Sequence, residues 1–69
     1  MTTGEKLAAL RKRKGITQER LSEILGVSRQ SVSRWEMDAA FPETEKLIKL
    51  SKLLECSVDF LLNEELTED

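Results

Sequence analysis

The chain has 69 residues and a net charge of −2, with one cysteine and no histidine. This length allows one small domain, the single cysteine excludes an internal disulfide, and the lack of histidine removes the commonest zinc ligand. The longest strictly apolar run, residues 7–10, is far shorter than the roughly 20 residues of a transmembrane helix, and no secretory signal precedes it. A soluble, cytoplasmic protein is therefore expected.

Helical spacing of apolar residues recurs in five segments, and no segment shows the apolar–polar alternation of a strand. Gly15 and Gly26 are placed at helix ends, and Thr17, Ser28 and Ser57 are placed as N-caps. The sequence predicts helices over about residues 5–14, 18–25, 29–37, 43–54 and 58–62.

The same helical spacing predicts which side of each helix faces the core. Two further residues are assigned individually: Pro42 is placed in the first turn of the fourth helix, and Cys56 is interpreted as a small buried side chain. The acidic segment 63–69 is expected to fray, or to begin a linker. The side chains predicted to face the core are Leu21, Ile24, Leu25, Val32, Trp35, Leu47, Leu50, Leu53 and Leu54, with Ile48 beside them.

The charge is divided unevenly along the chain. Residues 1–36 contain eight Lys or Arg against four Asp or Glu, a sum of +4, and residues 37–69 contain three against nine, a sum of −6. Such a chain can present a positive face to phosphate although its overall charge is negative. The net charge therefore does not exclude a DNA-binding protein.

Only Gly26, Val27 and Ser28 separate the second predicted helix from the third, which suits two helices that cross steeply in a helix-turn-helix. Residues 4–62 resemble the Cro/phage-repressor-type (Xre) helix-turn-helix family, whose lambda-repressor-like fold is a compact, all-α bundle of five short helices. The resemblance rests on Gly-Ile-Thr-Gln at 15–18, Leu21, Gly-Val-Ser at 26–28 and Trp35-Glu36, all in register.

The resemblance implies that the third helix lies in the major groove of double-stranded DNA and that the second lies across the DNA backbone. Arg29, Gln30, Ser33 and Arg34 are accordingly assigned to base recognition, because Arg suits guanine and Gln suits adenine as bidentate partners. An ordinary solvated surface is the alternative for all four, and for Ser33 the two interpretations are evenly balanced.

The start of the second helix is assigned to phosphate. Its free backbone N–H groups attract anions. The resemblance implies that Thr17 and Gln18 contact the DNA backbone there, and Ser28 is predicted to add a phosphate contact to its capping role. The resemblance further implies an ion pair between Arg11 and Glu36 that is structural rather than DNA-binding.

Two other segments bear on DNA binding. The basic run 12–14 complements the dipole of the first helix and adds non-specific attraction for phosphate. The loop 37–41 departs from the family pattern, which often has Asn-Gly and a basic residue after Trp-Glu. Asp38 tolerates the left-handed turn but cannot attract phosphate, so weak affinity for a single half-site is expected.

The sequence thus predicts a transcriptional regulator, most simply a repressor, that acts as a homodimer on a pseudo-palindromic operator. No metal, cofactor or small-molecule ligand is indicated, and an enzyme is not expected because histidine, tyrosine and a Gly-rich phosphate loop are all absent. Two alternatives remain open, namely an antitoxin-type interaction module and the N-terminal part of a longer regulator. The predicted dimer contacts are Phe60, Leu61 and Leu66.

Overall fold

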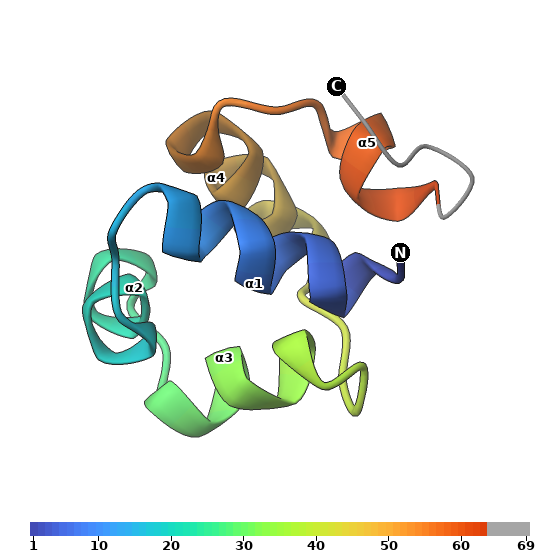
Figure 1. Ribbon diagram of the computed structural model, residues 1–69. Coiled ribbons are helices and arrows are strands. Elements are labelled where there is room, and N and C mark those ends of the chain that lie inside the picture. The colour runs from blue at the N-terminus through green and yellow to red at the C-terminus, as the bar shows by residue number, and fades with distance from the viewer. Residues whose placement is uncertain (64–69) are drawn as a thin grey trace.

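The computed structural model describes residues 1–63, which contain five helices and no strand (Figure 1). The predicted all-α, five-helix fold is therefore confirmed, and none of the helices described could span a membrane. The predictions for residues 64–69, including Leu66, lie outside the described residues. The helices are α1 (Thr3–Arg13), α2 (Gln18–Leu25), α3 (Arg29–Glu36), α4 (Thr44–Leu54) and α5 (Val58–Leu62).

Local capping explains most helix boundaries. The hydroxyl oxygens of Thr17, Ser28 and Ser57 each accept a hydrogen bond from a backbone N–H in the first turn of α2, α3 and α5, as predicted. Gly15 and Gly26 follow α1 and α2 with φ of +74° and +70°, the left-handed conformation that glycine adopts without steric cost.

Four boundaries differ from the prediction by one or two residues: α1 and α3 each end one residue earlier than expected, and the starts of α1 and α4 also differ. α1 begins two residues earlier than expected, because Thr2 and Glu5 form a reciprocal capping box. Pro42 was predicted in the first turn of α4 but precedes it. The extended backbone of Glu43 occupies the N-cap position, so α4 begins at Thr44.

One apolar cluster fills the space between the helices. Ile24 and Ile48 were placed with the core, but each is 43% exposed, because they lie on flanks of α2 and α4 that no other described helix covers. Leu53 and Cys56 are only partly buried. The buried apolar residues are Leu7, Leu10, Leu21, Leu25, Val32, Trp35, Leu47, Leu50, Leu54 and Leu61.

The short helix α5 is held by the first turns of α1. Lys6 is 1% exposed; its Nζ donates to the carbonyl oxygen of Phe60 at 2.7 Å and to that of Asn63, and it lies 4.6 Å from the centre of the Phe60 ring. Thr3 Oγ1 donates to the carbonyl oxygen of Leu61 at 2.7 Å. These bonds satisfy carbonyl groups that a helix end leaves without partners.

This arrangement corrects part of the predicted dimer contact. Leu61 is 0% exposed and cannot meet a second subunit, and Phe60 is half-buried against Lys6. Sequence reasoning missed Lys6, because a lysine in a basic helix is ordinarily a solvated side chain.

The N-terminus of α1 is anchored on the end of α3. Asp38 has φ of +59°, the left-handed turn that the sequence predicted. Its Oδ1 accepts a hydrogen bond from the Gly4 N–H at 2.9 Å, and its Oδ2 accepts one from Thr2 Oγ1 at 2.5 Å. A Cβ on Gly4 would lie 2.5 Å from the Trp35 carbonyl oxygen, so only glycine permits this approach of α1 to α3.

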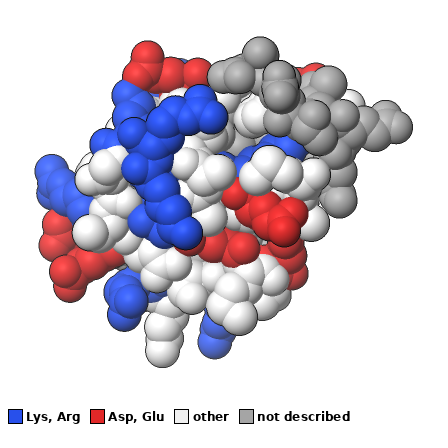
Figure 2. All heavy atoms as spheres, in the orientation of Figure 1, with Lys and Arg blue, Asp and Glu red and all other residues white. Residues whose placement is uncertain are grey.

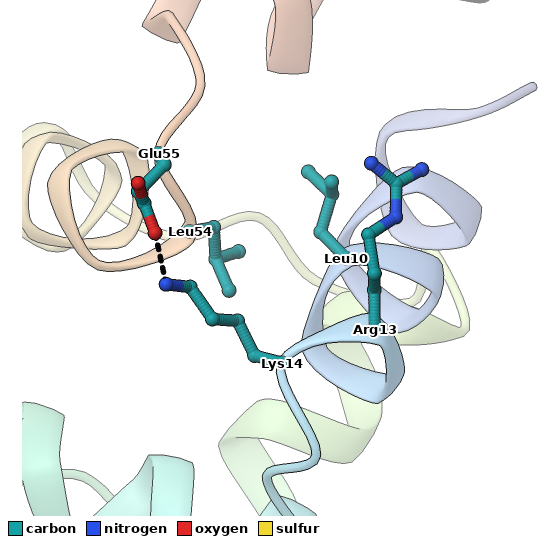
Figure 3. Close-up of a pocket in the computed structure, with 5 residues that line it drawn as sticks. All are labelled: Leu10, Arg13, Lys14, Leu54 and Glu55. Carbon is teal, nitrogen blue, oxygen red and sulfur yellow. Dashed lines mark hydrogen bonds and ion pairs between the residues drawn. The ribbon is translucent and has the colours of Figure 1, made fainter.

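The ends of α1 and α4 are joined by an ion pair between Lys14 and Glu55 (Figure 3). Both residues line a pocket whose apolar lining residues are Leu10 and Leu54. Glu55 ends α4 in the left-handed conformation, with φ of 58°. The hydrogen bond from Lys14, and then its positive charge, lower the pKa of Glu55 below its ordinary value of 4.5.

We expect this ion pair to make a small contribution to stability at neutral pH that disappears in acid. A carboxyl group whose pKa is lowered by folding stabilises the fold above its ordinary pKa, and this stabilisation is lost as pH falls through the folded-state pKa. The melting temperature of Glu55→Gln should therefore lie below that of wild type at neutral pH and match it in strong acid. Lys14→Gln should show the same pH dependence. A melting temperature lowered equally at both pH values would contradict a contribution from the ion pair.

Candidate nucleic-acid interface

Helix α3 lies at one edge of the molecule and packs on α1 and α2 (Figure 1). Val32 is 0% exposed and Trp35 is 7% exposed, so the inward face is core, as predicted. On the outward face the side chains of Arg29, Gln30 and Arg34 are exposed. The helix thus keeps one apolar stripe for packing and turns its polar residues to solvent.

The three outward side chains have no partner among the residues that the structure describes. Among residues 1–63, Arg29, Gln30 and Arg34 make no side-chain hydrogen bond and no ion pair. Ser33 differs, because it is half-buried and its Oγ lies 3.8 Å from the Sδ of Met37. Guanidinium and amide groups that are exposed and unpaired are well suited to hydrogen-bond an external ligand.

The structure brings most of the predicted base and phosphate residues together where α2 meets α3. One open groove is lined by Gln18, Arg29, Gln30 and Ser33. Another groove shares Gln18 and Arg29 with the first, and its remaining lining residues are Arg11, Thr17 and Glu19. Of the predicted contacts, Ser28 and Arg34 line neither groove.

The side chain of Gln18 is held by a buried polar network. Arg11 Nε donates to Glu36 Oε2 at 2.6 Å and Arg11 Nη2 to Glu36 Oε1 at 3.1 Å, and both side chains are about nine-tenths buried. Arg11 Nη1 also donates to the carbonyl oxygen of Ile16 at 2.7 Å. The same Glu36 Oε1 accepts a hydrogen bond from Gln18 Nε2 at 2.9 Å.

This network links the end of α3 to α1 and to the first residue of α2. The sequence predicted the Arg11–Glu36 pair but not the contact with Gln18. A glutamine at a helix start gives no local sign that its amide meets a carboxylate 18 residues further along the chain. Because only one amide hydrogen of Gln18 is used, the other N–H and the amide oxygen remain for an external partner.

Charged groups of both signs occupy this side of the molecule. In Figure 2 basic and acidic atoms lie side by side at the edge where α2 lies, whereas the side chains that project below α3 are basic or uncharged. Sequence reasoning missed Glu19, which is exposed in the first turn of α2 and lines the groove with Arg29. Its carboxylate is the one acidic group among the lining residues of the two grooves.

Comparison with known proteins places this arrangement in a family. The chain is 42% identical over 65 residues to the repressor protein C2 of Salmonella phage P22, covering 94% of this chain and 30% of that protein. It is 43% identical over 65 residues to the transcriptional activator BcrR of Enterococcus faecalis, covering 94% of this chain and 32% of that protein. The chain thus spans about a third of the length of these relatives.

The fold agrees equally well with a solved structure. The crystal structure of the P22 c2 repressor in complex with a synthetic operator superposes with a TM-score of 0.86 at 41% identity, covering 91% of this chain and 96% of that one. The sequence model described as "Helix-turn-helix" matches residues 7–61, which include all of α2 and α3 and the turn between them. The chain therefore belongs to the helix-turn-helix family.

Proposed function

We propose that this chain is a sequence-specific DNA-binding transcriptional regulator that reads the major groove with α3. The observation that carries the proposal is the outward face of α3, where Arg29, Gln30 and Arg34 are exposed and unpaired within the described residues. Arginine can donate two hydrogen bonds to guanine and glutamine can pair with both N6 and N7 of adenine. The chain acts by binding alone, without a catalytic step.

The start of α2 supplies the proposed backbone contacts. Gln18 and Thr17 lie at the N-terminal end of α2, where free N–H groups and the helix dipole favour a phosphate. The Gln18 amide is oriented by Glu36 before DNA binds, so binding costs little additional side-chain entropy at this residue. Ser28 caps α3 and adds a hydroxyl group at the protein–DNA boundary.

A homodimer on a pseudo-palindromic operator in the cytoplasm is the simplest form of this function. A single α3 offers few base contacts, and the loop 37–41 contains no basic residue that could hold phosphate. Two copies related by a two-fold axis would place two recognition helices about 34 Å apart, one turn of the DNA helix. The P22 c2 repressor, whose structure was solved with a synthetic operator, supports DNA as the partner.

Gln30→Ala tests the assignment of the groove. We expect this variant to lose discrimination at one base position by about 1–3 kcal/mol, because the bidentate contact with a base edge is removed. Selection from a random DNA library at a stated salt concentration would show this as one relaxed position in the preferred site. An unchanged preferred sequence would contradict the role of α3.

Gln18→Ala is the matched control for a backbone contact. It should weaken binding to every sequence alike and leave the preferred sequence unchanged, because a phosphate contact carries no base information. If Gln18→Ala selected a different DNA sequence, Gln18 would contact a base, and base recognition would not be confined to α3.

A further inference from the structure

Glu19 introduces a negative charge into the surface that is proposed to meet DNA. It is exposed in the first turn of α2, and it lines a groove together with Thr17, Gln18 and Arg29. The proposed phosphate position lies at the start of the same helix. A phosphate there would gain from the helix dipole but would meet the Glu19 carboxylate at close range.

The carboxylate of Glu19 is unpaired in the part of the chain that the structure describes. The other carboxylates of α1 to α3 all have partners: Glu5 accepts from the Thr2 N–H, Glu23 pairs with Arg20, and Glu36 pairs with Arg11. Among residues 1–63, the Glu19 carboxylate has no hydrogen bond and no ion pair, and only its backbone carbonyl is used, by Ser22 Oγ. An unpaired carboxylate therefore lines this groove.

We propose that Glu19 is an electrostatic brake on DNA binding. Its carboxylate opposes the phosphate at the start of α2 and so lowers the affinity for DNA of every sequence, operator and non-operator alike. Lasting binding then depends on the base contacts of Arg29 and Gln30. This inference rests on the proposed DNA-binding function and assigns a regulatory role to a residue of the same surface.

An alternative role for Glu19 makes a different prediction. Glutamate can accept a hydrogen bond from the N4 amino group of cytosine, in which case Glu19 would read a base. Removal of the charge would then weaken binding and relax one position of the preferred site. The brake predicts tighter binding with the preferred sequence unchanged.

Glu23→Gln provides a matched control for Glu19→Gln. Both residues are exposed on α2 and the substitution removes the same charge, but Glu23 pairs with Arg20 and lines neither groove. Two unit charges about 4 Å apart in water interact by about 1 kcal/mol, which corresponds to about fivefold in affinity. A charge outside the groove is screened over a Debye length of about 8–10 Å.

The experiment measures the dissociation constants of wild type, Glu19→Gln and Glu23→Gln for the selected operator duplex and for a scrambled duplex, at several salt concentrations. Glu19→Gln is expected to bind both duplexes about fivefold more tightly at low salt, with the gain shrinking as salt rises. Glu23→Gln should change either constant by less than about twofold.

Thermal unfolding of the same variants separates binding from folding. Loss of an acidic residue in the first turn of α2 should lower the melting temperature slightly, so tighter binding by Glu19→Gln could not arise from a more stable fold. The brake would be overturned if Glu19→Gln bound DNA no more tightly than wild type or Glu23→Gln. It would also be overturned if only the dissociation constant for the operator duplex changed. Wild-type protein that selected no DNA sequence would instead overturn the proposed function, and the brake with it.

Discussion

Replacing Arg11 by alanine is expected to lower the free energy of unfolding by about 3–5 kcal/mol, because the substitution leaves a buried carboxylate without its counter-ion. The Glu36 side chain is 8% exposed, and Arg11 supplies two of its three side-chain hydrogen bonds. Arg11 also donates to the carbonyl oxygen of Ile16 in the turn before α2. Loss of Arg11 would therefore loosen the joint between α1, α2 and α3. Denaturant unfolding followed by circular dichroism measures the change.

Lys12→Ala is the control for this substitution, because Lys12 is an exposed neighbour on the same helix. It should change the free energy of unfolding by no more than about 0.5 kcal/mol, as is usual for surface positions. A double variant, Arg11→Met with Glu36→Leu, should recover most of the lost stability, because removing both members of a buried pair leaves no uncompensated charge. Equal effects of Arg11→Ala and Lys12→Ala would show that the pair contributes nothing.

Gly4→Ala is expected to destabilise the fold by about 1–3 kcal/mol or more, the usual cost of overpacking. The added Cβ would lie 2.5 Å from the Trp35 carbonyl oxygen and 2.6 Å from that of Glu36. Both are backbone atoms at the end of α3, so they cannot rotate aside as a side chain would. α1 would have to move away from α3 and stretch the hydrogen bond from Gly4 to Asp38.

Helix propensity alone predicts the opposite sign. Alanine in a helix interior is about 1 kcal/mol more favourable than glycine, so Gly4→Ala would stabilise α1 if α3 did not approach it. Gly26→Ala serves as the comparison, because its Cβ would meet nothing within 4 Å and its cost would come only from the φ of +70°. A rise in the melting temperature of Gly4→Ala would refute the close packing of α1 on α3.

Helix positions were predictable because their signals are local. Thr17, Ser28 and Ser57 cap the helices that directly follow them, and each hydroxyl accepts from a backbone N–H three residues further along the chain. The buried pair Val32 and Trp35 was identified from spacing within a single helix. Ile24 was misplaced because spacing shows which residues share a stripe of a helix, but not how wide a stripe the neighbouring helices cover.

Contacts between distant segments could not be predicted in this way. Asp38 was expected only to tolerate a left-handed turn, yet both of its carboxylate oxygens hold the N-terminus of α1. Lys6 received no assignment from the sequence, and it is buried against the end of α5. Gly4 was not recognised, because the first helix was predicted to begin at about residue 5 and only the structure places this glycine inside α1 and against the end of α3.

By itself, the sequence determined the five helices, the apolar stripes that pack them and the polar side chains left on the outside of α3, because capping and helical period act over three or four residues. Only the tertiary structure decided that the Gln18 amide donates a hydrogen bond to Glu36 and that Glu19 lines the same groove as Arg29. Such neighbours depend on the angles and distances at which helices pack, and these follow from the shape of the whole core.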